Sequence, residues 1–315
     1  MEYRKLIKFG NSSHIISLPT NWIRKNKLKK GDLIYFEENG NNELVLNSEI
    51  KKERIEPKEI VIDLFNKDND EIKREIHSAY INNFNTINLT GRNLNEKEVL
   101  IRKIISNLMA LEIVEHSENK IMLKDFLDMD KIFIENMIRK IDILIRAILY
   151  DFKSVDNSEK FEAIYRKDYD VNKLTFLVYR AVKYIINNPS AIKDNKFDTW
   201  KLMNYWQLAD RLERIGDEAK RVARALMKIN LDSKEFKKLV DLLNRIEAFY
   251  GGVMNAYHKS DVQALYKILK LKDDLIKDCD NYFNLYKRKD LVPSIIDKLK
   301  DMIDHIRTIA RLLYN

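Results

Sequence analysis

The chain has 315 residues, enough for two or three domains, with 45% hydrophobic residues to form cores and 34% charged residues to cover them. Its net charge of +8 favours a polyanionic partner such as nucleic acid or a membrane surface. The single cysteine, Cys279, excludes internal disulfides, no apolar run approaches the roughly 18 residues of a membrane span, and the N-terminus lacks the apolar core of a signal peptide. We therefore expect a cytoplasmic protein in a reducing compartment, with no integral membrane segment.

Residues 1–50 are predicted to form a small β-rich domain. Short apolar runs bounded by Gly, Asn and Ser are typical of strands, and Pro19 introduces a helical turn. We expect four strands, at Tyr3–Phe9, His14–Leu18, Leu33–Phe36 and Glu43–Leu46. Four such short strands enclose too small a core to be stable alone, so this domain needs to oligomerise or to dock on another.

The same domain is strongly basic. Residues 1–30 contain one acidic residue, Glu2, against eight basic ones: Arg4, Lys5, Lys8, Arg24, Lys25, Lys27, Lys29 and Lys30. This density, doubled in a dimer, is typical of a surface that binds the phosphate backbone of DNA. A basic surface that only improves solubility is the alternative.

Several segments of this domain resemble the AbrB/SpoVT family of DNA-binding domains. They are Lys8-Phe9-Gly10-Asn11-Ser12-Ser13, Ser17-Leu18-Pro19, Trp22-Ile23 and Leu28-Lys29-Lys30-Gly31-Asp32. The resemblance implies a swapped-hairpin β-barrel in which two chains interleave, hence an obligate homodimer that presents a basic face to DNA. Where the bacterial subfamily often has a basic residue after the glycine, this chain has Asn11-Ser12-Ser13 and resembles the longer archaeal form. By position in the family pattern, the candidates for DNA contact are Arg4, Lys5, Lys8, Arg24 and Lys25.

Residues 55–127 are predicted to form a small α/β domain, because strand and helix patterns alternate along them. The expected elements, in the order β-α-β-α-β-β, are Glu59–Leu64, 69–83, Thr86–Thr90, Glu96–Leu111, Glu112–His116 and Lys120–Leu123. We find no catalytic motif among them. A role in linking the flanking domains, or in reading an effector, is a hypothesis that rests on position in the chain alone.

From Lys131 onward the apolar residues recur at helical spacing. The expected helices span about 131–153, 158–187, 197–228, 233–258, 261–287 and 292–314. Two consecutive trios form an internal repeat, and each trio is long enough to close a three-helix bundle. We therefore predict an all-α repeat of two bundles, at residues 128–230 and 231–315.

The third of these helices carries the segment Asp210-Arg211-Leu212-Glu213-Arg214-Ile215-Gly216-Asp217. Glu213 and Asp217 are four residues apart on one helix face, where like charges repel and a hard cation would relieve the repulsion. The alternative is a solvated ladder of ion pairs, in which Asp210 pairs with Arg214, Arg214 with Glu218, and Asp217 with Arg221. Glycine inside a helix costs roughly 1 kcal/mol against alanine, so Gly216 indicates close packing.

The segment Leu212-Glu213-Arg214-Ile215-Gly216-Asp217-Glu218-Ala219 resembles the signature of the PhoU family of phosphate-uptake regulators. That family is built of repeated three-helix bundles, whose Glu/Asp-x-x-x-Asp motifs on adjacent helices bind metal clusters. The resemblance implies a site for iron, zinc or manganese. Asn172 replaces the final acid of the other motif, and Ile276 and Lys300 stand at partner positions in the second repeat, so we expect that repeat to hold no metal. The predicted ligands are Asp168, Asp170, Glu213 and Asp217.

Together these features predict a homodimeric transcription regulator linked to phosphate uptake, in which an N-terminal domain binds DNA and helical domains sense a signal or dock a partner. The alternative is an adaptor that does not bind DNA and regulates a phosphate transporter or its signalling protein. Paired carboxylates also serve metal-assisted hydrolysis. However, the sequence has no histidine in the Glu213 motif, no Gly-rich phosphate loop and no Cys/His cluster, so we do not expect an enzyme.

Overall fold

The computed structural model describes residues 3–38, 43–48, 57–154, 158–188 and 198–313. The chain divides into two compact units, 1–56 and 57–315, and each is described here by itself. The boundary predicted between residues 50 and 55 lies outside the described residues. The further division of the second unit at residues 127 and 230 stays a prediction.

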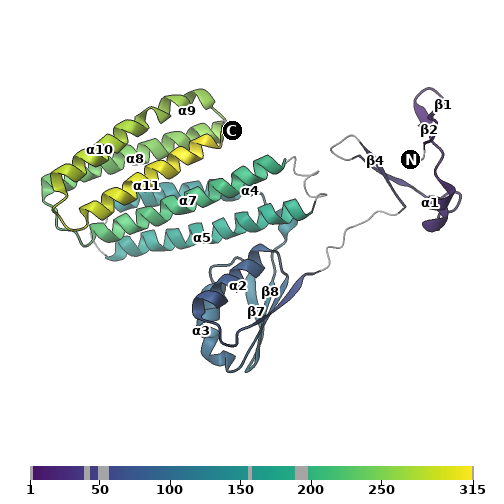
Figure 1. The fold of residues 1–315 in the computed structure, drawn as a ribbon, viewed down its shortest axis with the longest axis horizontal. Coiled ribbons are helices and arrows are strands. Elements are labelled where there is room, and N and C mark those ends of the chain that lie inside the picture. Colours follow the sequence, from purple (N-terminus) through teal and green to yellow (C-terminus); the bar gives the residue numbers. More distant parts are fainter. Residues whose placement is uncertain (1–2, 39–42, 49–56, 155–157, 189–197, 314–315) are drawn as a thin grey trace. The chain divides into compact units, whose positions relative to one another are not determined.

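The first unit consists of two antiparallel hairpins and a short helix (Figure 1). The first hairpin pairs strand β1 (Ile7–Phe9) with β2 (Ser13–Ile15), and Gly10 takes a φ of 69° in the turn between them, a conformation that glycine adopts without strain. Helix α1 (Thr20–Lys25) follows, and strand β3 (Tyr35–Glu38) then pairs with β4 (Leu44–Asn47). The predicted small β-rich region is confirmed. Its described strands do not close a barrel within one chain.

The second unit begins with a four-stranded mixed sheet in the order β5-β6-β8-β7. β5 and β6 run parallel, whereas β8 is antiparallel to both β6 and β7. The hydrophobic cluster of this part includes Ile76, Ile87 and Ile101, which come from a helix, a strand and the other helix. The elements are β5 (Glu59–Asp63), α2 (Asn69–Ile81), β6 (Thr86–Thr90), α3 (Leu94–Ile105), β7 (Leu111–Ser117) and β8 (Lys120–Asp125).

The rest of the second unit is helical, as predicted, because the apolar residues of each segment form one continuous stripe. The short 3₁₀ helices η1 (Met129–Lys131) and η2 (Phe152–Ser154) flank the first long helix. The α-helices are α4 (Ile134–Asp151), α5 (Ser158–Asn187), α7 (Thr199–Leu226), α8 (Ser233–Lys259), α9 (Val262–Leu269), α10 (Leu271–Tyr286) and α11 (Val292–Arg311).

The single helix predicted at 261–287 is wrong in one respect, since it is divided at Lys270 into α9 and α10. The division coincides with the packing of Ile268 against Gly252 of α8, where a Cβ atom would lie 3.1 Å from the Ile268 Cδ1 atom. The absence of a side chain at Gly252 lets α9 lie against α8, while α10 continues along the bundle (Figure 1).

The two helical trios share one core. α4, α5 and α7 pack against one another, and α11 packs against α7 as well as against α8 and α10. One cluster of buried side chains therefore runs through both trios. Gly216 of α7 is buried in it, and a Cβ atom there would lie only 2.9 Å from the Ile145 Cδ1 atom of α4, which explains the glycine.

A buried ion pair joins the sheet part to the helical part. Arg180 of α5 and Asp125 at the end of β8 have side chains that are each 1% exposed, and the Arg180 guanidinium donates hydrogen bonds to both carboxylate oxygens. The same guanidinium lies 4.5 Å from the centre of the Tyr80 ring and donates to the Asn83 side chain at 2.9 Å. No helix within the described residues is long and apolar enough to cross a membrane.

Candidate functional site

The predicted carboxylates lie on the adjacent helices α5 and α7 of the first trio. Asp168 of α5 is buried, with its side chain 4% exposed. It faces α7 beside Gly216, where the absence of a Cβ atom lets the two helices approach closely. Glu213 and Asp217 of α7 lie near it, since all three carboxylates influence one another electrostatically. The structure thus brings together three of the four predicted ligands.

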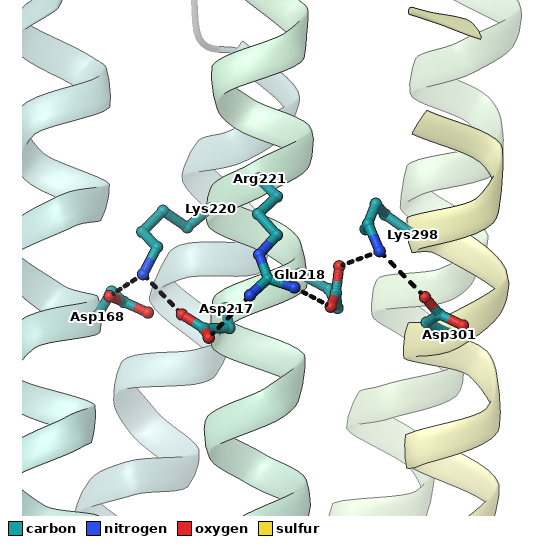
Figure 2. Close-up of polar contacts among 7 residues, drawn as sticks. All are labelled: Asp168, Asp217, Glu218, Lys220, Arg221, Lys298 and Asp301. Carbon is teal, nitrogen blue, oxygen red and sulfur yellow. Dashed lines mark hydrogen bonds and ion pairs between the residues drawn. The ribbon is translucent and has the colours of Figure 1, made fainter. Parts of the chain in front are cut away.

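Lys220, which is not among the predicted ligands, lies between two of these carboxylates (Figure 2). The Lys220 ammonium donates hydrogen bonds to Asp168 Oδ2 at 2.5 Å and to Asp217 Oδ1 at 2.6 Å. Burial acts to lower the pKa of Lys220, but the hydrogen bonds to both carboxylates outweigh it and raise the pKa above its usual value. The site therefore contains a permanent positive charge of its own.

Within the part of the chain that the structure describes, no cation forms a hydrogen bond to Glu213 in this way. Burial raises its pKa to about 7, and the nearby carboxylates of Asp217, Asp168 and Asp210 contribute to the rise, whereas Arg214 acts in the opposite direction. A carboxyl group with this pKa exchanges its proton near neutral pH. The arrangement can hold or release a proton at Glu213, and it does so in a partly buried position next to other negative charges.

Asp170, the fourth predicted ligand, lies elsewhere. Two residues along a helix correspond to a rotation of about 200°, so Asp170 points away from Asp168. It lines a groove with Lys140 and Leu144 of α4 and with Met109 from the loop before β7. Within the described residues, no group of three or more His, Cys, Asp or Glu side chains is arranged to hold a metal ion. Asp170 does not join the other three predicted ligands, and Lys220 bonds to two of those three, so these residues do not fit a shared metal as they lie.

The ion pairs continue from Lys220 across α7 to α11 (Figure 2). Arg221 lies 3.4 Å from Asp217 and 2.6 Å from Glu218, and Lys298 of α11 lies 3.4 Å from Glu218 and 3.3 Å from Asp301. We call these seven residues the charge network: Asp168, Lys220, Asp217, Arg221, Glu218, Lys298 and Asp301.

Two rungs of the ladder that the sequence suggested are present, at 3.0 Å between Asp210 and Arg214 and at 3.4 Å between Asp217 and Arg221. The third differs, because Glu218 is buried and pairs with Arg221 and with Lys298 of α11 instead of with Arg214. The spacing between Asp217 and Lys220 was a visible signal for their contact. No sequence signal pointed to Lys298, which comes from the other trio.

The second trio has no such convergence of carboxylates within its described residues. Asp304 pairs with Arg307 at 2.7 Å, and Lys300 pairs with Asp280 at 2.6 Å. Asp274 of α10 lies 3.9 Å from Lys277. Each of these acids therefore has a cation close to it in the folded chain.

The five residues predicted to contact DNA are all exposed in the first unit. Lys8 is in β1, directly opposite His14 of β2, and Arg24 and Lys25 form the last turn of α1. Arg4 and Lys5 precede β1, and the Arg4 guanidinium donates a hydrogen bond to the Tyr3 carbonyl at 3.4 Å. Lys8, Arg24 and Lys25 therefore present their side chains at the surface of the first unit.

Comparisons with known proteins assign a family to two segments of the chain. Residues 134–226 match the model of the PhoU domain, and residues 7–60 match the model described as antidote-toxin recognition MazE, bacterial antitoxin. The chain thus contains a PhoU domain and an N-terminal domain of the MazE and AbrB type, which confirms both resemblances. Comparison with the curated proteins found no match.

Among solved structures, the crystal structure of PhoU from Pseudomonas aeruginosa is similar to this chain, with 17% sequence identity and a TM-score of 0.48. The similarity covers 57% of this chain and 93% of that one.

Proposed function

We propose that this chain is a homodimeric DNA-binding regulator of transcription linked to phosphate uptake. One observation carries the proposal: a unit of MazE and AbrB type, with accessible basic residues on its first hairpin and helix, shares a chain with a PhoU domain. The first feature suits binding to DNA phosphates. The PhoU domain relates the signal that the regulator would detect to phosphate uptake. The role is regulatory, with no catalytic step.

The first unit supplies the argument for a dimer. None of its described side chains is buried, and large apolar residues such as Phe9 and Phe36 are 65% and 64% exposed. A unit of this size with its apolar side chains in water is not stable, so another surface must cover them. We assign that surface to the first unit of a second copy. Interleaving of the two pairs of hairpins would close the swapped barrel and double the basic charge on one face.

The second unit is suited to report a signal. α5 contacts α7 through the charge network and contacts the sheet part through Arg180 and Asp125. A change in the helical part would therefore reach the sheet part through one continuous helix. A ligand or partner shifts such a unit only if it binds two of its states with different affinity.

The experiment that tests the proposal is fluorescence anisotropy of the full-length protein, over a series of salt concentrations, with the DNA upstream of its own coding sequence and with an unrelated duplex. The test variant replaces Lys8, Arg24 and Lys25 by alanine. The matched control removes the same charge from the second unit, at the exposed residues Lys228, Lys237 and Lys259. We expect the salt dependence to flatten in the test variant only, by about one unit for each DNA phosphate that the variant no longer binds.

Two outcomes would contradict the proposal. Equal, steep salt dependence for both duplexes and both triple variants would reduce the first unit to a non-specific basic surface. Absence of binding at low salt would favour an adaptor that regulates a phosphate transporter or its signalling protein. In that case a pull-down should recover a transporter subunit without DNA.

A further inference from the structure

The Lys220 ammonium occupies the position that a cation shared by α5 and α7 would take. Its distances of 2.5 and 2.6 Å to the carboxylates of Asp168 and Asp217 are those of close, charge-assisted hydrogen bonds, shorter than the usual range of about 2.7–2.9 Å. The contact is sheltered, since the Lys220 side chain is 15% exposed and that of Asp168 is 4% exposed. A metal ion that bound these oxygens would have to displace the ammonium, which would then remain nearby as a like charge.

The other predicted ligands, Asp170 and Glu213, do not make up a metal site without the two carboxylates that Lys220 bonds. Asp170 faces a groove on another side of α5, and Asn172 stands where the family motif has an acid. Glu213 is the one carboxylate of the predicted set that Lys220 does not bond and that still faces the other acids. A single carboxylate beside an ammonium is a poor site for iron, zinc or manganese, which bind several ligands at once.

We infer that Lys220 is the resident cation of the helical part, which therefore holds α5 and α7 together with an internal ammonium in place of a metal ion. The charge network extends this role, because Arg221 and Lys298 link the same helix to α11 (Figure 2). Whatever signal the helical part detects, it is not a metal bound between these helices. The inference stands independently of DNA binding.

Metal titration of the full-length protein tests this inference. The probes are Mn²⁺, Zn²⁺ and, without oxygen, Fe²⁺, followed by calorimetry, elemental analysis and thermal unfolding. Wild type and Glu213→Gln should contain equally little metal, and EDTA or added metal should leave the wild-type Tm unchanged. Lys220→Ala should lower the Tm and bind Mn²⁺ at least about ten-fold more tightly than wild type, because a repelling charge is gone.

Two further variants provide controls. Lys220→Arg keeps the positive charge and should remain as indifferent to metal as wild type. Lys228→Ala removes an exposed lysine just beyond the end of α7 and should change neither the Tm nor the metal affinity. If Lys220→Ala does not fold, the comparison between wild type and Glu213→Gln decides the question by itself.

One ion of iron, zinc or manganese per wild-type chain, lost in Glu213→Gln and accompanied by a rise in Tm, would overturn the inference. A folded Lys220→Ala variant with unchanged Tm and metal affinity would also overturn it. Neither result depends on whether the protein binds DNA, so the inference can fail while the proposed function stands.

Discussion

The two units of this chain differ in how much of their own apolar surface they bury. The second unit contains two clusters of buried side chains, one under the sheet and one through all the long helices. In the first unit, by contrast, none of the described side chains is buried. The first unit has apolar residues at strand positions all the same, and several of them, such as Phe9 and Phe36, are exposed. The second unit folds around cores of its own, whereas the described side chains of the first unit form no such core.

Removal of the first unit should have the largest effect of the changes considered, and the effect should be on the oligomeric state. Residues 57–315 contain both clusters, so they should remain folded. The dimer that we propose should become a monomer, because the proposed interface lies in the first unit. Sedimentation velocity of the full-length chain and of residues 57–315 checks this. A dimer of residues 57–315 at the same concentration would place the interface in the second unit and would contradict this contrast between the two units.

The ion pair between Arg180 and Asp125 tests how firmly the second unit is held together. Removing one partner of a pair that is fully buried leaves an uncompensated charge, so Arg180→Met should cost about 3–5 kcal/mol of unfolding free energy. Denaturant unfolding measures the loss. Arg74→Met, which changes an exposed arginine of α2, is the matched control and should cost less than about 0.5 kcal/mol.

A second substitution separates the charge from the packing. In Arg180→Met/Asp125→Asn the buried negative charge is removed as well, so the double variant should be more stable than Arg180→Met alone. If the double variant is no more stable, the effect of Arg180 comes from its packing on Tyr80 and not from its charge.

Substitution of Glu213 should change the free energy of unfolding by a smaller amount, and the change should depend on pH. Its pKa of about 7 lies above the usual value, so its contribution to stability is complete below pH 4.5 and is lost as the pH rises through 7. Glu213→Gln avoids this loss. The variant should match wild type at pH 4.5 and exceed it by about 2 kcal/mol at pH 8, a figure that allows for partial exposure.

Denaturant unfolding of both proteins at these two pH values measures the difference. Asp170→Asn, which removes an exposed carboxylate from α5, is the control and should show no such dependence on pH. A stability difference between wild type and Glu213→Gln that is the same at both pH values would show that burial of the charge is not its cause.

Most helices were predictable from the sequence. The helix predicted at 158–187 is α5, and those predicted at 233–258 and 292–314 are α8 and α11 to within a few residues, because each has one apolar stripe at helical spacing. The close approach at Gly216 was also predictable, since an uncompensated glycine inside a helix needs a neighbour that excludes a side chain. The division at Lys270 was not, because it coincides with a contact between α9 and Gly252 of α8 that spacing within one helix does not reveal.

The candidate site was predictable only in part. The sequence alone determined which carboxylates share a face of α7 and, through the family motif, that Asp168 belongs with them, because helical spacing places such residues together. That Asp170 lies on another side of α5 from Asp168 also follows from helical spacing, although the family motif grouped the two. Only the tertiary structure decided that Lys220 joins Asp168 to Asp217 and that Lys298 reaches Glu218 from the other trio. Local spacing governs contacts within one helix, whereas contacts between helices depend on how whole helices pack, and no short stretch of sequence encodes that arrangement.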